Sequence, residues 1–363
     1  MDCTGVVASE ESNILGFIPL QFRQQVLRPG VIAPVVYENA VGVSEPMRGR
    51  GIGLTMIETA VEFIGNRADA LFVIRGGESS PGYRFYRKSG HSDLSYAVSH
   101  SHPRPESLTR DRTLDIRRVR ERKWLASESE LIHFYNEVYA GYGGGRLRSP
   151  GYWPEIFDGH VFKEREWILL IARDKRERLA GYAIFAPGTW KDHQDLHLYE
   201  IAASGEIVVE SLLSAGAKFA PGRPLRAPQI SLANPVAPTL NRLGFEEERS
   251  EPHIMARVIR PHRLFIRLAD SNPDVADFRS TVNLICSTPH RTIDLQTPPQ
   301  PEHTINLEMK EHMLARLLLC RLDLRSAIEN ELVRCRGDKG TLIDTLAEIC
   351  RPAPWIQWFT DYV

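Results

Sequence analysis

The run Arg48-Gly49-Arg50-Gly51-Ile52-Gly53 is the sequence feature that most restricts the possible folds of this chain. It follows a stretch with strand character at 31–43 and precedes apolar residues at helical spacing over 54–64. Glycine lets a backbone approach a ligand closely, and the first N–H groups of a helix have no intrahelical acceptor. A strand, a glycine-rich turn and a helix N-terminus in this order predict an anion site suited to a pyrophosphate.

Glycine-rich turns also occur in other phosphate-binding folds, so the turn alone does not identify the site. A P-loop requires Lys followed by Ser or Thr, and this run has neither. A Rossmann fold places an acidic residue at the end of the next strand, and the sequence has none there. A tight turn that binds nothing remains an alternative at this point.

A second motif, Phe85-Tyr86-Arg87-Lys88-Ser89-Gly90-His91, follows the next apolar run. Together the two motifs resemble those of the GNAT superfamily of N-acetyltransferases, in which R-x-x-G-x-G/A precedes F-Y-x-x-x-G-F/H. The resemblance is specific over residues 40–92. One departure is visible, because the proline that usually follows Val43 by two residues is displaced by one, to Pro46.

The resemblance implies that acetyl-CoA is the cosubstrate and that no metal is needed. The strand residues Val41, Gly42 and Val43 would receive the pantetheine arm. The pyrophosphate would lie on a cradle made by Arg48, Gly49, Arg50, Gly51, Ile52, Gly53 and Leu54.

The second third of the chain repeats the order of elements of the first. The phrase Asn241-Arg242-Leu243-Gly244-Phe245 takes the place of the segment that ends at Gly90 and His91. Four residues before the glycine stands Leu240 instead of Tyr86, and Ser204-Gly205-Glu206 replaces the cradle. This half is therefore interpreted as a scaffold without a coenzyme site.

The whole layout resembles the enhanced intracellular survival (Eis-like) acetyltransferases. The resemblance implies an α/β (α+β) fold with two tandem GNAT-like domains with mixed sheets, then a small α+β sterol-carrier-like domain. The expected domains are 1–112, which binds the coenzyme, 113–260, which is degenerate, and 261–363. Relative to the family, the first domain would lack its first strand and helices, so the N-terminus would be truncated.

The expected chemistry is attack of a neutral amine on the thioester carbonyl. A lysine-like amine costs about 4.6 kcal/mol to deprotonate at pH 7, so the reaction needs a base. The resemblance implies that this base is the C-terminal carboxylate of Val363 and that Tyr86 is the acid, with Tyr83 as its substitute. Asp361 would add negative potential for a cationic acceptor. The aromatic tail at 355–362 is expected to pack rather than to fray.

Segments outside the motifs also carry local structural signals. Residues 99–107 have linker character. In the last hundred residues the patterns predict strands at 282–286, 292–296 and 304–307, and helices at 308–322, 326–335 and 339–350.

The bulk composition limits the partners. Lys and Arg number 45 and Asp and Glu 46, so the net charge of -1 gives no field that favours nucleic acid or an anionic membrane. The acceptor is expected to be a small-molecule or peptide amine, the assembly a homo-oligomer and the location cytoplasmic.

His193 and His197 stand four residues apart, but on a strand that spacing does not converge on a metal. The alternative function is a non-catalytic acyl-CoA-binding scaffold or sensor.

Overall fold

The structure is a computed structural model that describes residues 3–74, 78, 80–119, 126–158, 166–187, 195–248, 250–272, 275–337 and 340–362. The chain forms two compact units. Unit 1 contains Met1–Ser95 and Pro252–Pro354, and unit 2 contains Tyr96–Glu251 and Trp355–Val363. Each unit therefore combines segments that are far apart in the sequence. The predicted domains, with boundaries at residues 112 and 260, are instead three consecutive segments of the chain, and these boundaries stay predictions.

The larger sheet of unit 1 has the strand order β1-β2-β3-β5-β13, and the short strand β4 pairs with β2. Strands β3 and β5 are parallel, whereas the β1–β2, β2–β3 and β5–β13 pairs are antiparallel. The elements before residue 95 are β1 (Cys3–Glu10), β2 (Asn13–Arg28), β3 (Val31–Glu38), β4 (Gly42–Val43), the 3-10 turn η1 (Glu45–Met47), α1 (Ile52–Ile64), β5 (Ala70–Ile74) and α2 (Pro81–Lys88).

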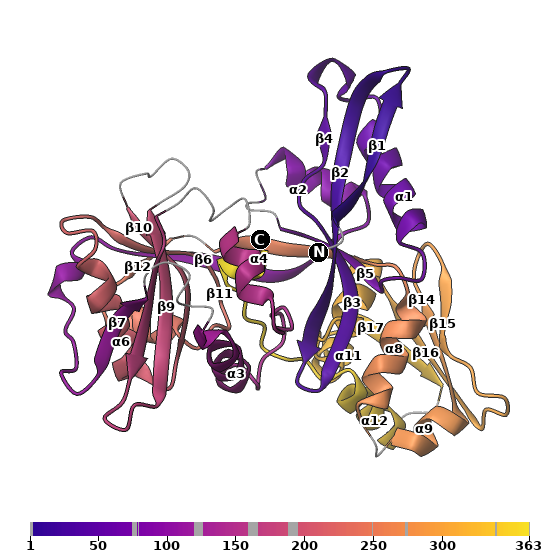
Figure 1. The fold of residues 1–363 in the computed structure, drawn as a ribbon. Coiled ribbons are helices and arrows are strands. Elements are labelled where there is room, and N and C mark those ends of the chain that lie inside the picture. The colour runs from indigo at the N-terminus through magenta and orange to yellow at the C-terminus, as the bar shows by residue number, and fades with distance from the viewer. Residues whose placement is uncertain are drawn as a thin grey trace. The chain divides into compact units, whose positions relative to one another are not determined.

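Helix α1 covers β1 and β2 of this sheet (Figure 1). Its buried residues are Met56, Ile57, Ala60 and Ile64, which is the periodic stripe expected of a helix that packs on one face. They join strand residues such as Ile18 and Val36 in one apolar core. The predicted helix over 54–64 is therefore confirmed and begins two residues earlier, at Ile52.

The C-terminal part of unit 1 adds a four-stranded sheet with the order β15-β14-β16-β17. Its elements are β13 (Glu251–Val258), α8 (Pro261–Asp270), α9 (Ala276–Thr281), β14 (Val282–Ser287), β15 (Thr292–Gln296), β16 (His303–Met309), α10 (Glu311–Leu318), α11 (Leu324–Glu329), β17 (Val333–Gly337) and α12 (Thr341–Ile349). Helix α8 packs against both β3 and β15, and so links this sheet to the larger one.

Two of the helices predicted here are wrong in part. The strand β16 continues to Met309, so the helix predicted from 308 begins only at Glu311. The helix predicted over 326–335 ends at Glu329, and Cys335 lies on β17. The second helix was predicted too long because the apolar residues of β17 follow those of α11 after a single turn. In this turn Glu331 adopts a positive φ of 56°.

Unit 2 is built on a sheet with the order β6-β11-β10-β9-β8-β7, and β12 pairs with β6. Its elements are β6 (Ser92–His102), η2 (Pro105–Ser107), β7 (Asp115–Val119), α3 (Glu128–Val138), α4 (Tyr152–Asp158), β8 (Ile168–Arg173), β9 (Leu179–Pro187), β10 (Leu196–Ala203), α6 (Glu206–Ala217), β11 (Leu225–Ser231), α7 (Ala237–Arg242), β12 (Glu246–Glu247) and η5 (Phe359–Tyr362). The first four residues of β6 belong to unit 1.

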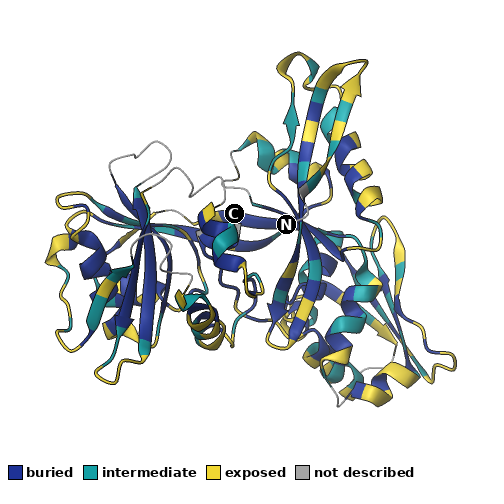
Figure 2. Ribbon diagram, in the orientation of Figure 1, coloured by how far each residue is buried: buried dark blue, intermediate teal, exposed yellow. Residues whose placement is uncertain are grey.

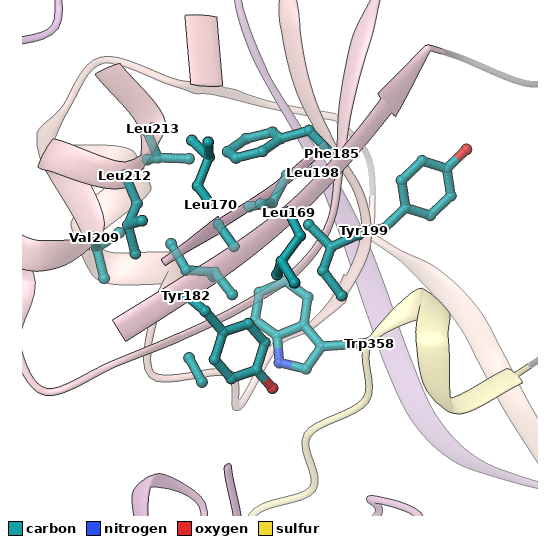
Figure 3. Packing of buried hydrophobic residues seen from close by; sticks show 14 of the residues in the cluster. Leu169, Leu170, Tyr182, Phe185, Leu198, Tyr199, Val209, Leu212, Leu213 and Trp358 are labelled. Carbon is teal, nitrogen blue, oxygen red and sulfur yellow. The ribbon is translucent and has the colours of Figure 1, made fainter. Parts of the chain in front are cut away.

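The central strands of unit 2 are buried along nearly their whole length (Figure 2). Helix α6 packs against β8, β9 and β10, while α3 packs against β9 and β10. Trp358, from the C-terminal tail, belongs to the same apolar core as Leu169 and Tyr182 (Figure 3). The tail is therefore part of the core of unit 2, and the prediction that it packs is confirmed.

The two halves of the chain exchange strands. Strand β13 comes from the end of the second half and pairs with β5 in unit 1, with Ala256 opposite Phe72. Residues Ala97–His102 of β6 come from the end of the first half and pair with β11 in unit 2. The stretch 99–107 was predicted to be a linker, and this is wrong for 99–102, because these residues continue β6.

Of the helices that the structure describes, none combines the length and the apolar character needed to cross a bilayer.

Candidate active site

The backbone leaves the central sheet of unit 1 immediately after β3. Strand β3 pairs with β5 as far as Glu38, opposite Val73. The chain then forms β4, in which Gly42 and Val43 pair only with Phe17 and Gly16 of β2 among the described strands. The predicted single strand over 31–43 is thus two strands with a break between them. The break leaves β4 paired on one side, as expected of a strand that could receive an extended ligand on the other.

The turn from β4 into α1 exposes helix N–H groups. Gly49 and Gly51 have φ of 78° and 84°, a left-handed conformation that non-glycine residues rarely adopt, and a Cβ on either would meet open space. Gly51 is the N-cap of α1, and no side chain caps this end. The first turn of α1 carries no acidic residue. The free N–H groups and the positive end of the helix dipole therefore remain available for an anion.

A cavity of about 550 Å³ lies at this turn. It is lined by Val43, Met47, Arg48, Gly49, Gly51, Ile52, Gly53, Leu54, Pro81, Arg84, Phe85 and Lys88. Seven of the ten residues predicted to bind the coenzyme are among them. The other three, Val41, Gly42 and Arg50, do not line the cavity, although Val41 lies close behind Gly53.

The cavity combines positive charge with apolar surface. Arg48, Arg84 and Lys88 are cationic and exposed, and no carboxylate is among the lining residues that the structure describes. The Nε of Arg48 donates a hydrogen bond to the Val43 carbonyl at 3.2 Å, so this side chain links the turn to β4. Arg84 and Lys88 lie one helical turn apart on α2 and were not predicted. Their spacing of four residues beside the F-Y motif could have revealed them.

Gly53 lines the cavity and also has a packing role that was not predicted. A Cβ on Gly53 would lie 2.9 Å from Cε2 of Phe85, closer than real contacts allow. The absence of a side chain at this position therefore lets α2 pack against the first turn of α1. At Gly49 and Gly51 no neighbouring atom lies where a Cβ would be, and the close approach of a ligand to these glycines stays a prediction.

The end of α2 explains why the second motif contains a glycine. His91 N–H donates to the Tyr86 carbonyl at 3.0 Å, and Gly90 N–H donates to the Arg87 carbonyl at 3.3 Å. Gly90 has a φ of 85°. This is the Schellman arrangement, in which a left-handed residue satisfies the last carbonyls of a helix. The glycine of Y-x-x-x-G thus ends the helix that carries Tyr86.

The same arrangement recurs in unit 2. Phe245 N–H donates to the Leu240 carbonyl at 3.1 Å, and Gly244 N–H donates to that of Asn241 at 3.0 Å. Leu240, in the place of Tyr86, is fully buried. Gly205, the N-cap of α6, has an extended φ of 174° where the cradle of unit 1 is left-handed, and Glu206 occupies the first turn. The acidic residue at this helix end disfavours an anion.

Tyr86 is buried and does not line the cavity. Its side chain is 1% exposed, and its ring makes edge contacts with Phe85 and His91. Tyr83, the predicted substitute, is partly buried and donates a hydrogen bond to Oδ2 of Asp93 at 2.9 Å. Desolvation, followed by the hydrogen bond to Asp93, raises the pKa of Tyr83 to about 12. Tyr83 is therefore neutral and already engaged.

Thr360 and Asp361 of the C-terminal tail belong to a buried polar cluster of unit 2. Arg148 makes two hydrogen bonds to the carboxylate of Glu200, at 2.5 and 2.7 Å, and a third to Oδ1 of Asp361 at 3.2 Å. Tyr152 donates to the Thr360 carbonyl at 3.0 Å, and the Thr360 hydroxyl donates to Glu200. Asp361 was expected to add negative potential for a cationic acceptor; the structure buries its side chain and binds it to Arg148, which Glu200 shares, and the expected role stays a prediction.

Burial sets the ionisation of this cluster. Desolvation raises the pKa of Tyr135 and Tyr182 well above the usual tyrosine value. Burial alone would lower the pKa of Arg148, but the Glu200 carboxylate beside it raises the pKa well above the usual value. The tyrosines therefore stay neutral donors and Arg148 stays charged. Val363, the predicted base, lies outside the described residues.

Among the described residues no three His, Cys, Asp or Glu side chains are arranged to hold a metal ion. Of the two histidines considered for a metal, His193 lies outside the described residues and His197 lies on β10.

Residues 1–91 match the family model described as Acetyltransferase (GNAT) family. A solved structure from Enterococcus faecalis V583, described as a conserved protein of unknown function and probable N-acyltransferase, superposes with a TM-score of 0.70 at 15% identity, over 98% of this chain and 88% of that chain. A GCN5-related N-acetyltransferase from Kribbella flavida has a TM-score of 0.66 at 16% identity, over 97% and 87%. Eis1 from Mycobacterium abscessus has a TM-score of 0.62 at 12% identity, over 98% and 89%.

No curated protein sequence matches the chain significantly. The structural matches extend over nearly the whole chain, so they show that its fold is the GNAT fold of these proteins. The predicted mixed α/β class is thereby confirmed. At identities of 12 to 16% they show the fold alone.

Proposed function

We propose that this protein transfers an acetyl group from acetyl-CoA to the amine nitrogen of a small-molecule or peptide acceptor. The observation that carries the proposal is the cavity at the uncapped N-terminus of α1, between the one-sided strand β4 and helix α2. The backbone N–H groups after Gly51, with Arg48, would hold the pyrophosphate. Arg84 and Lys88 would face the remaining phosphate of the coenzyme. The apolar side chains of Val43 and Phe85 would face its pantetheine arm.

The proposed reaction is a direct transfer. The neutral amine forms a bond to the thioester carbonyl carbon, the C–S bond breaks, and Tyr86 gives its hydroxyl proton to the departing sulfur. The tyrosinate then regains a proton from solvent. The proton lost by the amine goes to a base, for which we retain the Val363 carboxylate on the resemblance alone. Backbone N–H of β4 near Val43 would stabilise the oxyanion.

The proposal is tested by incubating the purified protein with acetyl-CoA and a panel of amines. Release of free thiol together with an acetylated amine, identified by mass spectrometry, supports transfer. Thiol release without an acetylated amine would mean hydrolysis and would contradict it.

The base is tested separately, through the C-terminus. Adding one or two residues after Val363 moves the carboxylate, so activity is expected to be lost without a change in melting temperature, whereas Val363→Phe keeps the carboxylate and the activity. Full activity in the extended chain would rule out this base.

A second candidate function is supported by the burial of Tyr86. A tyrosine that is 1% exposed and does not line the cavity suits a protein that binds acyl-CoA without reacting. Binding of acetyl-CoA with no transfer to any amine would favour this scaffold or sensor. Four further parts of the proposal rest on the sequence: the Eis-like type, the sterol-carrier likeness of residues 261–363, the homo-oligomer and the cytoplasmic location.

A further inference from the structure

Strands β10 and β11 of unit 2 pair over only a short stretch. Leu196 lies opposite Leu225 and His197 opposite Arg226, and beyond these pairs β10 pairs with β9 and β11 with β6. In unit 1 the parallel strands β3 and β5 hold the same places in the sheet, and their pairing ends at Glu38. The chain then enters β4 of the candidate active site. The opening between β10 and β11 is therefore the counterpart of the opening that we propose for the coenzyme.

The C-terminal tail connects β10 and β11 beyond the end of their pairing. The Ser231 hydroxyl of β11 donates to the Trp355 carbonyl at 2.5 Å. The Thr360 hydroxyl donates to the carboxylate of Glu200, which lies on β10. Both strand residues follow the last parallel pair. The tail segment 355–361 therefore bridges the opening of unit 2.

A glycine turn of unit 2 fits closely around the start of this segment. Ile356 N–H donates to the Gly143 carbonyl at 2.9 Å, and Gly143 forms a parallel bridge with Trp355. Gly144 has a φ of 85°, and a Cβ there would lie 2.8 Å from the Ile356 carbonyl oxygen, closer than real contacts allow. Only glycine leaves room for the tail backbone at this position.

Side chains fix the rest of the segment. The indole N–H of Trp358 donates to the Tyr139 hydroxyl at 3.2 Å, and this hydroxyl donates to the Ile201 carbonyl of β10. Trp355, Trp358 and Thr360 are all buried. A shift of the tail by one residue would leave several of these buried polar groups unpaired, so the contacts define a single register.

We propose that unit 2 is the receptor for the C-terminal segment 355–361, which it holds as a resident ligand in the counterpart of the coenzyme opening. Gly205 at the adjoining helix end is extended and Glu206 follows it, so this opening suits a peptide better than a pyrophosphate. One consequence rests on the proposed function. The residues that hold the tail are positioning residues for the Val363 carboxylate, because they fix the chain directly before it.

Gly144→Ala tests the binding of the tail without reference to activity. Gly151→Ala is the matched control, because Gly151 is also left-handed, with a φ of 92°, but a Cβ there would meet open space. In protein labelled with ¹⁵N-tryptophan, we expect Gly144→Ala to move the Trp358 indole signal to that of a solvent-exposed indole. Gly151→Ala should leave it in place, and the signal of the buried Trp153 reports whether unit 2 is folded. A Trp358 signal unchanged in Gly144→Ala would overturn the proposal.

Insertions test the register in chains that keep every side chain. A glycine inserted after Pro354, which is exposed, lies before all the contacts, so the same residues should bind and the Trp358 signal should stay. A glycine inserted after Trp358 separates the contacts at 355–358 from those at 360–361. It should lower the melting temperature by about 5 °C or more. Equal losses in the two insertions would show that the tail packs without a defined register, contrary to the proposal.

Kinetics test the positioning of the base. A glycine inserted after Asp361 keeps the contacts but displaces the chain end, so kcat should fall about 10²-fold with an unchanged melting temperature and KM for acetyl-CoA. The insertion after Pro354 should keep kcat within a few-fold of wild type. Full activity of the Asp361 insertion would refute the positioning role. If the wild-type protein transfers no acetyl group, the proposed function fails, and the NMR and melting results still decide whether unit 2 binds the tail.

Discussion

Phe85 closes over Gly53, so that a Cβ on Gly53 would lie 2.9 Å from Cε2 of the Phe85 ring. The two residues belong to the two motifs, and their contact packs α2 against the first turn of α1. The contact therefore sets the width of the cavity, which both residues line.

Gly53→Ala is expected to destabilise the protein by about 1–3 kcal/mol, because the added methyl group overpacks this contact. Phe85→Leu makes room, so the same glycine substitution should cost less in that background. Urea unfolding of the four proteins of this double-mutant cycle gives the coupling energy. Equal costs of Gly53→Ala in the two backgrounds would show that Phe85 is not what restricts position 53.

Tyr86→Phe is expected to lower kcat by about 10²- to 10⁴-fold with little change in acetyl-CoA affinity, because only the transition state uses the hydroxyl proton. Tyr83→Phe is the matched control. Its hydroxyl is engaged by Asp93, and its substitution should leave kcat within a few-fold of wild type. Steady-state kinetics and calorimetry compare the two. A larger loss in Tyr83→Phe would transfer the role of the acid to Tyr83.

The two motifs were predictable because each contains a local backbone requirement. Gly51 must be left-handed to begin α1, and Gly90 must be left-handed to end α2. Such requirements lie within a few residues of one another and leave a direct trace in the sequence.

The buried polar clusters were not predictable, because their members are distant in the sequence. Arg148 and Glu200 are 52 residues apart, and Arg148 and Asp361 are 213 apart. Glu38, at the end of β3, and His91, after α2, are also far apart in the sequence, yet Nε2 of His91 lies 3.2 Å from Oε1 of Glu38. The strand exchange was missed for the same reason, since nothing local distinguishes a β6 that pairs in unit 2 from one that pairs in unit 1.

Arg148→Met is expected to destabilise unit 2 by about 3–5 kcal/mol, because it leaves Glu200 and Asp361 buried without a cation. Asp361→Asn is the milder matched variant. It keeps a polar side chain at the end of the tail and leaves both hydrogen bonds from Arg148 to Glu200 in place. Denaturant unfolding should rank the two variants in this order. A cost for Asp361→Asn as large as that for Arg148→Met would show that the tail carboxylate, and not Arg148, holds the cluster together.

His253 is expected to make the stability of the protein depend on pH. Desolvation lowers the pKa of His253 in β13 to about 4, from an ordinary value of 6.5. The folded state keeps the neutral form, whereas the unfolded state binds a proton below 6.5, so this contribution is complete above pH 6.5 and is lost as the pH falls towards 4. The full loss is roughly 3 kcal/mol. His253→Gln should flatten the free energy of unfolding over this range, and an unchanged slope would contradict the assignment.

The central claim is that the N-terminus of α1 binds the pyrophosphate of acetyl-CoA, and Leu54 gives the most direct test of it. Leu54 lies in the first turn of α1, lines the cavity and is 37% exposed, so it tolerates a polar side chain. Leu54→Glu places a carboxylate at the helix end where we propose that the pyrophosphate binds. Leu54→Gln is the same change without the charge.

The measurement is calorimetric titration of both variants with acetyl-CoA at low and high salt. We predict that Leu54→Glu binds acetyl-CoA about tenfold more weakly than Leu54→Gln, and that the difference shrinks as salt screens the charges. Equal affinities of the two variants, in proteins with equal melting temperatures, would contradict the claim that the coenzyme lies at this helix end.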